Sequence, residues 1–296
     1  MSPALTWVVK LSDGQIAAAV GLLAAAAAAD GVDPVSEAAV LRLVHPTSDQ
    51  TGMHLLAHDA TGTLVGYASL DEHVARRTAE LAVHPAHRRR GVGGALLAAL
   101  LDRVDGRLWV WAHGEHPAAL RLAHRTGLVR KRELFQLRRG LADPIPARHL
   151  PDGVAMRAFE PGADEAAVVR VNDRAFGWHP EQSRWDVNEL VVRQSQPWFD
   201  PKGFLLAVDR SDRLLGFHWT KVHPDGLGEV YVIAVDPGAQ GTGVGGALIT
   251  AGLAHLRDRG LAQAMLYVES DNDAALRTYQ KLGFIRHHTD VAFLRP

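Results

Sequence analysis

An internal duplication is the feature that most constrains how this 296-residue chain can fold. Residues 81–103 hold an apolar stretch, a proline, a glycine-rich stretch and a long apolar segment, and residues 233–259 repeat this order. Farther on, HPAALRLAHRTGL at residues 116–128 recurs as NDAALRTYQKLGF at residues 272–284. Recurrence of several motifs in one order marks two copies of one structural unit. We therefore predict two duplicated domains.

The segment between the copies reads GLADPIPARHLPDG at residues 140–153, and this proline- and glycine-rich composition is typical of a linker. The predicted domains are residues 1–139 and 154–296. In each copy we expect a strand, one or two helices, a hairpin, a long strand, the glycine loop, a helix, a strand, a short helix and a final strand. This order indicates an α+β fold, with a mixed and mostly antiparallel sheet flanked by helices.

Composition excludes several classes of protein. The chain has no cysteine, so it has no disulfide framework, no cysteine-ligated metal and no thiol nucleophile. A net charge of −1 lacks the electrostatic footprint of a nucleic-acid binder. The apolar run from Ile16 to Ala29 is shorter than the roughly 20 residues of a membrane span. Ser12 and Gln15 before it resemble a capping box, so we expect a buried helix in a cytoplasmic protein with no membrane partner.

The glycine-rich stretch of the second copy, QGTGVGG at residues 240–246, lies between a strand and an amphipathic helix. Small residues at a helix start let several backbone N–H groups converge where the helix dipole favours an anion, which predicts a phosphate site. The alternative is a tight turn with glycines for packing. The stretch also fits a dinucleotide fingerprint. However, it lies deep in each copy rather than in the first strand-to-helix turn, and Arg89 replaces the first glycine in the earlier copy.

The two motifs together resemble the GCN5-related N-acetyltransferase family, in which a [QR]-x-x-G-x-[GA] loop precedes an N-x-x-A-x-x-x-Y-x-x-x-G-F segment. The second copy matches both motifs in full, at Gln240, Gly243, Gly245, Asn272, Ala275, Tyr279, Gly283 and Phe284. The first copy keeps Arg88, Gly91 and Gly93, but it has His116 in place of the Asn and Ala123 in place of the Tyr.

By this resemblance the loop amides hold the pyrophosphate of coenzyme A, and acetyl-CoA is the cosubstrate. In the second copy the implied coenzyme contacts are Ile233, Ala234, Val235, Gln240, Gly241, Thr242, Gly243, Val244, Gly245, Gly246, Asn272, Asp273, Ala274, Ala275, Leu276 and Arg277. In the first copy they are Leu81, Ala82, Val83, Arg88, Arg89, Arg90, Gly91, Val92, Gly93 and Gly94.

Acetyl transfer from a thioester to an amine needs a base for the ammonium, a donor that polarises the carbonyl, and a proton for the thiolate. The resemblance assigns the acid to Tyr279 and the carbonyl contact to a backbone N–H at 233–235. Glu229, which begins the strand before the loop, is the candidate base, acting directly or through a water; the alternative is a solvated strand end. Alternation puts 229, 231, 233 and 235 on one face unless a bulge intervenes.

The first copy lacks both candidate proton-transfer groups. Arg77 takes the place of Glu229, and Ala123 takes the place of Tyr279. The first copy nevertheless retains its glycine loop. We therefore expect it either to bind coenzyme without turnover or only to support the second copy.

Tandem halves of this length, with only the second fully equipped, are similar to the mycothiol synthase family of actinobacteria. This resemblance implies acetylation of the cysteinyl amine of Cys-GlcN-inositol, the last step of mycothiol formation. The substrate contacts it implies are Glu37, Glu181, Lys221, Glu229 and Tyr267. Each has a plainer alternative: both Glu37 and Glu181 suit a helix start, Lys221 a solvated strand end, and Tyr267 an aromatic cleft lining.

Two other functions stay open from the sequence. One is a tandem acetyltransferase for another amine, such as an aminoglycoside, a polyamine or a protein amino terminus. The other is a non-catalytic acyl-CoA sensor. Histidines at 113, 116, 287 and 288 lack the spacing of metal ligands, so no metal is expected. Because a duplicated domain can substitute for a homodimer, we expect a monomer.

Overall fold

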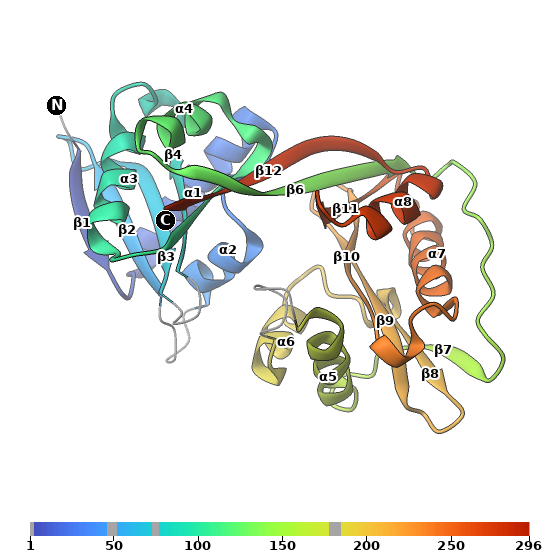
Figure 1. Ribbon diagram of the computed structural model, residues 1–296. Helices are drawn as coiled ribbons and strands as arrows, with labels where there is room; N and C mark the ends of the chain where they lie inside the picture. Colours follow the sequence, from blue (N-terminus) through green and yellow to red (C-terminus); the bar gives the residue numbers. More distant parts are fainter. Residues whose placement is uncertain (1–2, 46–51, 73–76, 178–184, 296) are drawn as a thin grey trace. The chain divides into compact units, whose positions relative to one another are not determined.

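The computed structural model describes residues 3–45, 52–72, 77–177 and 185–295 (Figure 1). The chain divides into two compact units: unit 1 comprises residues 1–134 and 288–296, and unit 2 comprises residues 135–287. The last residues of the second sequence copy thus group with unit 1, and residues 135–139 of the first copy group with unit 2. The domain boundaries expected at residues 139 and 154 are boundaries between the two sequence repeats, and they stay a prediction.

Unit 1 is an α+β unit whose sheet has the strand order β1-β2-β3-β4-β5-β12. Its neighbouring strands are antiparallel except for the parallel pair β4 and β5. The strands are β1 (Ala4–Val8), β2 (Gly52–His58), β3 (Leu64–Asp71), β4 (Thr78–Val83), β5 (Leu108–Ala112) and the end of β12 (Ile285–Arg295). The helices are α1 (Asp13–Asp30), α2 (Glu37–Val44), α3 (Val92–Arg103) and α4 (Pro117–Arg125), with 3-10 turns η1 (Pro85–His87) and η2 (His113–Glu115).

The alanine-rich run forms α1, as the sequence predicts. Ser12 and Gln15 make both bonds of the capping box, and the helix ends at Gly31 with φ 70°. Its buried face includes Leu22 and Leu23, which belong to an apolar cluster with Tyr67 of β3. Throughout the described ranges, we find no helix with enough length and hydropathy to cross a bilayer.

Unit 2 repeats this construction, with the strand order β6-β11-β10-β9-β8-β7. Its parallel pair is β10 with β11, and the other paired strands with a known register are antiparallel. The strands are the end of β6 (Val129–Gly140), β7 (Val154–Ala158), β8 (Phe204–Asp209), β9 (Leu214–Val222), β10 (Gly228–Val235) and β11 (Gln263–Glu269). The helices are α5 (Glu165–Phe176), α6 (Val187–Gln194), α7 (Val244–Asp258) and α8 (Asp273–Lys281), with η3 (Pro201–Gly203) and η4 (Pro237–Ala239).

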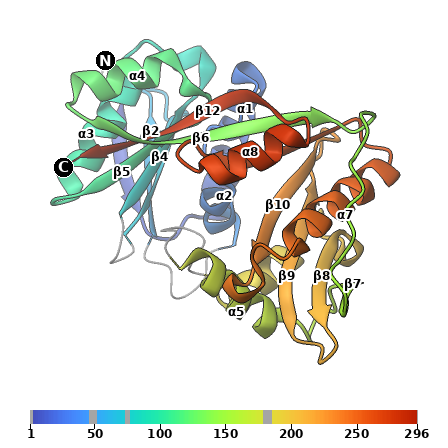
Figure 2. The ribbon, with the colours of Figure 1, turned by 45° about the vertical axis from the view of Figure 1, so that its right-hand side comes forward.

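Two apolar layers cover opposite faces of the unit 2 sheet. On one face, Val168 and Val171 of α5 cluster with Phe217, Trp219 and other side chains of the strands. On the other face, Leu248 of α7 packs with residues of β8 and β10, and Figure 2 views the unit with α7 in front of these strands. The sheet therefore separates two environments, and the candidate site uses both.

Candidate active site

The second glycine loop forms the N-terminus of α7. Gly241 has φ 77° and Gly243 has φ 100°, a left-handed backbone that glycine adopts without steric cost. The Gln240 side chain donates to the carbonyl of Val235 (3.3 Å), which ties the loop to the end of β10. In the described chain no side chain caps α7. Its first amides are therefore uncapped by side chains, which is what the predicted phosphate site requires.

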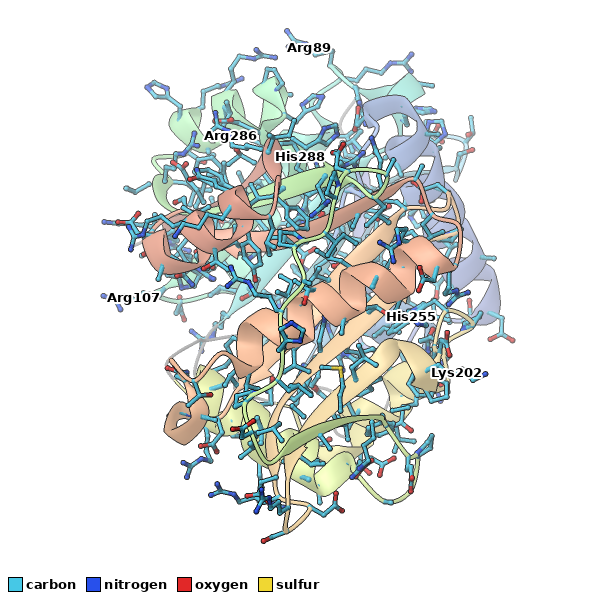
Figure 3. All side chains as sticks on the ribbon, turned by 90° about the vertical axis from the view of Figure 1, so that its right-hand side faces the viewer. Arg89, Arg107, Lys202, His255, Arg286 and His288 are labelled. Atoms are coloured by element: carbon cyan, nitrogen blue, oxygen red, sulfur yellow. The ribbon has the colours of Figure 1, made fainter. Side chains whose placement is uncertain are left out.

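Unit 1 builds the same loop with less suitable residues. Gly91 has φ 85°, but the position of Gly241 is taken by Arg89, which adopts φ 64° and points outward from the ribbon in Figure 3. Arg88 donates to the carbonyl of Val83 (3.2 Å) and pairs with Asp30 at 2.7 Å through both ends of its guanidinium. A cavity of about 550 Å³ adjoins this loop, lined by residues of β4, β5, α3 and α4. The first copy thus retains a preformed hollow beside its loop.

The parallel pairing of β10 with β11 stops early. The register joins Gly228 to Ala264 and Glu229 to Met265, whereas β10 stays paired with β9 as far as Val235. Within the described residues, the β11-facing edge of β10 beyond Glu229 therefore has no strand partner in this register. This opening contains residues 233–235, whose amides are predicted to polarise a thioester carbonyl. In unit 1 the register of β4 with β5 likewise ends at Glu80 and Trp111.

A β-bulge at Tyr231 changes which residues of β10 share a face. Val230 pairs with Thr220, and Val232 pairs with the next residue, Trp219, so Tyr231 is the extra residue. The alternation expected for 229, 231, 233 and 235 is therefore wrong beyond Tyr231. Since cross-strand partners share a face, Glu229 lies on the face of Val232, which is the α5 side of the sheet.

The bulge also corrects the comparison between the copies. Glu229 pairs with Lys221 at the end of β9, and the matching pair in unit 1 is Thr78 with Asp71, because β4 has no bulge. By strand register the equivalent of Glu229 is therefore Thr78 rather than Arg77. The conclusion is unchanged, since neither residue supplies a carboxylate.

Glu229 and Lys221 form the charged centre of the α5-side face. The Glu229 side chain is 9% exposed, and its Oε2 lies 2.7 Å from Nε2 of His223. The Lys221 ammonium is buried over two aromatic rings, 4.9 Å from the centroid of Trp198 and 5.2 Å from that of Tyr231. Aromatic faces attract a cation that has lost part of its hydration. Neither Glu229 nor Lys221 is the solvated strand-end residue of the alternative interpretation.

Tyr279 lies on the opposite side of the sheet. Asn272 caps α8 by accepting the N–H of Ala275 (3.1 Å), and Tyr279 packs on a cluster that includes Leu266 of β11. Burial raises the pKa of Tyr279 to about 12, which keeps the hydroxyl protonated at neutral pH. In unit 1 His116 caps α4 in the same way, through the N–H of Ala118 (3.1 Å), but Ala123 offers no hydroxyl.

Of the other expected substrate contacts, Tyr267 joins the face of Glu229, since it is two residues beyond Met265 on β11. Its hydroxyl accepts a hydrogen bond from the Gln136 amide (3.0 Å). Glu37 is in unit 1, directly after Ser36, the N-cap residue of α2. Glu181 lies outside the described residues. The structure therefore places Lys221 beside Glu229 and puts Tyr267 on the same face of the sheet.

A buried ionic network occupies the corresponding region of unit 1. Glu80 accepts hydrogen bonds from the backbone and hydroxyl of Ser36, and His113 lies between Glu80 (3.4 Å) and Asp290 of β12 (2.8 Å). Burial opposes the imidazolium charge, but hydrogen bonds to the two carboxylates outweigh it and raise the pKa of His113 to about 10. Among the described residues, no set of three acidic or histidine side chains is grouped as a metal site.

Sequence reasoning missed several residues of the unit 2 site. His223 could have been found, because the turn PDG at 224–226 folds the chain back and brings the end of β9 beside Glu229. The aromatic pair around Lys221 had no local signal, since Trp198 is far from Tyr231 in the sequence. Arg148 of the expected linker lies beside the start of α7, with its Cδ 3.9 Å from where a Cβ on Gly246 would be.

Comparison with known proteins identifies the family. Residues 23–128 and 169–284 match the acetyltransferase (GNAT) family. The chain belongs to the GNAT acetyltransferase family. Curated relatives match along nearly the whole chain and carry the name mycothiol acetyltransferase. One from Saccharopolyspora erythraea is 52% identical over 294 residues (90% of this chain, 97% of the relative), and one from Nocardia farcinica is 52% identical over 299 residues (97% and 96%).

Solved structures share the tandem fold at lower identity. A GCN5-related N-acetyltransferase from Sphaerobacter thermophilus has a TM-score of 0.71 at 23% identity and covers 98% of this chain. A tandem GNAT protein from the clavulanic acid biosynthesis pathway has a TM-score of 0.73 at 20% identity and covers 99%. The predictions of an α+β tandem GNAT fold and of an N-acetyltransferase are thus confirmed.

Proposed function

We propose that this chain transfers the acetyl group of acetyl-CoA to the cysteinyl amine of Cys-GlcN-inositol and so makes mycothiol. Relatives about half identical over most of the chain carry the corresponding name. The site observation that supports the proposal is that Glu229 and Tyr279 lie on opposite sides of the sheet, with Glu229 in the last residue pair that joins β10 to β11. Such an arrangement suits acetyl transfer through the gap between β10 and β11, with Glu229 as the base on the amine side and Tyr279 as the acid on the thioester side.

In the proposed reaction Glu229 takes a proton from the substrate ammonium, directly or through one water. An amide N–H at 233–235 donates to the thioester oxygen as negative charge develops there. Tyr279 donates its proton to the departing thiolate, since burial keeps its hydroxyl protonated. The amine nitrogen forms the new C–N bond as the C–S bond breaks.

The coenzyme is proposed to bind along the α7 side. The uncapped amides of α7 and the positive-φ glycines Gly241 and Gly243 suit its pyrophosphate, and Asn272 fixes the start of α8 beside it. The corresponding loop of unit 1, with its adjoining cavity, is proposed to hold a second coenzyme without turnover. Because unit 1 has Thr78 and Ala123 at the positions of the base and the acid, it lacks the groups that would move protons.

The amine substrate is proposed to bind on the α5 side. Lys221 and Tyr267 would donate to its hydroxyls or carbonyl, and Glu229 would hold its ammonium. Glu37 and Glu181 are proposed as further substrate contacts by resemblance. The active species is proposed to be a monomer, with no nucleic acid or membrane as partner.

The proposal is tested by following coenzyme A and amide product with chromatography and mass spectrometry. Free-thiol detection alone is ambiguous, because Cys-GlcN-inositol carries its own thiol. The panel comprises Cys-GlcN-inositol, its S-methyl derivative, GlcN-inositol, an aminoglycoside and spermidine. We expect rapid turnover of the first two only. Glu229→Gln should lower kcat by about 100-fold or more, the scale of general-base catalysis.

Asp225→Asn is the matched control, since this nearby side chain serves the turn by accepting the N–H of Leu227 (3.1 Å), a role that Asn retains. Its kcat should equal that of the wild type. Preference for another amine in the panel would replace the proposed substrate. Coenzyme binding without turnover of any amine would favour a sensor instead.

A further inference from the structure

Glu229 and His223 are joined by a hydrogen bond. This contact bears on how the proton that Glu229 takes from the substrate ammonium leaves the site. Glu229 is buried, and within the described residues His223 is the one hydrogen-bond partner of its carboxylate. The His223 side chain is 20% exposed against 9% for Glu229. The imidazole is therefore the more exposed member of this hydrogen-bonded pair.

The β9–β10 turn fixes His223 in place. The backbone N–H of His223 donates to the carbonyl of Leu227 (2.9 Å), and the carbonyl of His223 accepts from the N–H of Gly226 (2.9 Å). Gly226 has φ 82°, the left-handed conformation that closes the turn. Because the hairpin holds the His223 main chain at both its N–H and its carbonyl, the imidazole ring has few positions open to it. The hairpin therefore helps to hold the ring against Glu229.

The proposed reaction releases one proton for each acetyl group transferred. An ammonium and a thioester give an amide, a thiol and a free proton. Tyr279 gives one proton to the thiolate and regains one from the nitrogen as the amide forms. The remaining proton, taken from the ammonium, stays on Glu229 and must leave before the next substrate can be deprotonated.

We propose that His223 is the proton exit for Glu229, an inference that rests on the function proposed above. The proton moves from Oε2 of Glu229 to Nε2 of His223, so an O–H bond breaks and an N–H bond forms. The proton on Nδ1 then passes to water, which leaves the proton on Nε2, where the ring donates to the Glu229 carboxylate. Loss of that proton to solvent and uptake of one at Nδ1 return the tautomer that accepts the next proton. Glu229 is again a carboxylate, and one proton has reached solvent. Histidine is suited to this step because its ring both accepts and releases protons near neutral pH.

The charged groups around the pair are few among the described residues. Lys221 faces Glu229 from β9, Asp225 lies in the turn, and Arg193 of α6 donates to the Tyr231 hydroxyl (3.1 Å). Lys221 is therefore the charged side chain directly opposite Glu229 across the paired strands.

The test compares His223→Gln with His255→Gln in the full-length protein. His255 is a matched control: it also pairs with a carboxylate, Asp200 (3.5 Å), and its side chain is also 20% exposed. We expect His223→Gln to lower kcat about 10- to 100-fold, with little change in KM for either substrate. Imidazole added at millimolar concentration should restore most of the rate. His255→Gln should match the wild type with and without imidazole.

A pH–rate profile separates proton transfer from a merely structural role. With a relay, the loss in His223→Gln should change with pH and with buffer concentration, whereas the wild-type rate should not depend on buffer. An unchanged kcat, or a loss that is equal at all pH values and insensitive to imidazole, would overturn the relay alone. A wild-type protein inactive on every amine would instead overturn the proposed function, and the relay with it. Thermal melts of both variants check folding.

Discussion

The two copies differ at one loop position, where unit 1 has Arg89 and unit 2 has Gly241. It adopts φ 64° where its counterpart Gly241 has φ 77°. A side chain in the left-handed region costs roughly 1 kcal/mol, and the outward-pointing Arg89 (Figure 3) makes no hydrogen bond or ion pair with the described residues that would offset this cost. Unit 1 therefore carries local strain in its loop.

Replacing Arg89 by Gly should remove this strain. We expect Arg89→Gly to raise the free energy of unfolding by about 0.5–1 kcal/mol, measured by urea unfolding without ligand. Arg90→Gly is the control, because Arg90 is also exposed but has no positive φ. It should be neutral or destabilising. Equal effects of the two variants would contradict the strain argument.

Tyr279 carries the residue-scale prediction for catalysis. Tyr279→Phe keeps the ring that packs on Phe284 (5.8 Å between centroids) and removes the acidic proton. We expect kcat to fall about 100-fold or more, while acetyl-CoA affinity measured by calorimetry stays within about twofold. If affinity falls as far as the rate, Tyr279 contributes to binding rather than to protonation of the thiolate.

Strand β12 makes contacts in unit 1 with residues that are far from it in the sequence. Asp290 on this strand accepts from Gly114 (2.8 Å) and contacts His113, residues more than 170 positions earlier in the chain. Glu80 links the same histidine to the N-cap of α2. One imidazolium thus joins β12, η2, β4 and α2 within unit 1.

Removing this imidazolium should loosen unit 1. We expect His113→Gln to lower the free energy of unfolding by about 2–4 kcal/mol near pH 7, since it leaves two buried carboxylates without their cation. The raised pKa of His113 means that its contribution is fully present below about pH 6.5 and is lost as pH rises through about 10. Glu80, whose pKa is lowered mainly by His113 against the opposing effect of burial, loses its contribution as pH falls below its ordinary value.

Urea unfolding at pH 7 and above pH 10 checks this prediction. The difference between wild type and His113→Gln should shrink at the alkaline pH. His124→Gln on the exposed side of α4 is the control and should be neutral. A difference that is constant with pH would assign the effect to packing instead of charge.

At the scale of the element, the sequence predicted what local patterns encode. The capping box of α1 and the glycine loops at the starts of α3 and α7 follow from short motifs, and each occurs as expected. The bulge at Tyr231 did not follow, because it depends on how β9 and β10 share hydrogen bonds. The hydrogen bond between His113 and Asp290 could not be predicted from the sequence either, because it depends on where the last strand lies.

At the scale of the whole molecule, the duplication predicts two coenzyme sites of unequal use. Gly94 and Gly246 occupy matching third positions of α3 and α7, and a Cβ at either meets nothing closer than 3.9 Å. Asp at a helix start suits the helix dipole but repels a phosphate. The two substitutions therefore act on coenzyme binding with little cost to the fold.

We expect the wild type to bind two equivalents of acetyl-CoA in calorimetry. Gly94→Asp should bind one equivalent and keep its kcat, whereas Gly246→Asp should lose turnover and retain the other equivalent. If Gly94→Asp binds as the wild type does, the unit 1 loop is not a coenzyme site. If Gly246→Asp keeps its activity, catalysis is wrongly assigned to unit 2.

The contribution of β12 to unit 1 has a consequence for biosynthesis. Residues 291–295 pair with Leu108–Ala112 of β5, and a ribosome makes them after all of unit 2. Domains commonly fold in the order in which they are translated, but the first sheet here stays one strand short until the end of β12 emerges. Until then the edge of β5 is open to other chains, so chaperones would meet the N-terminal half of the nascent protein before the C-terminal half.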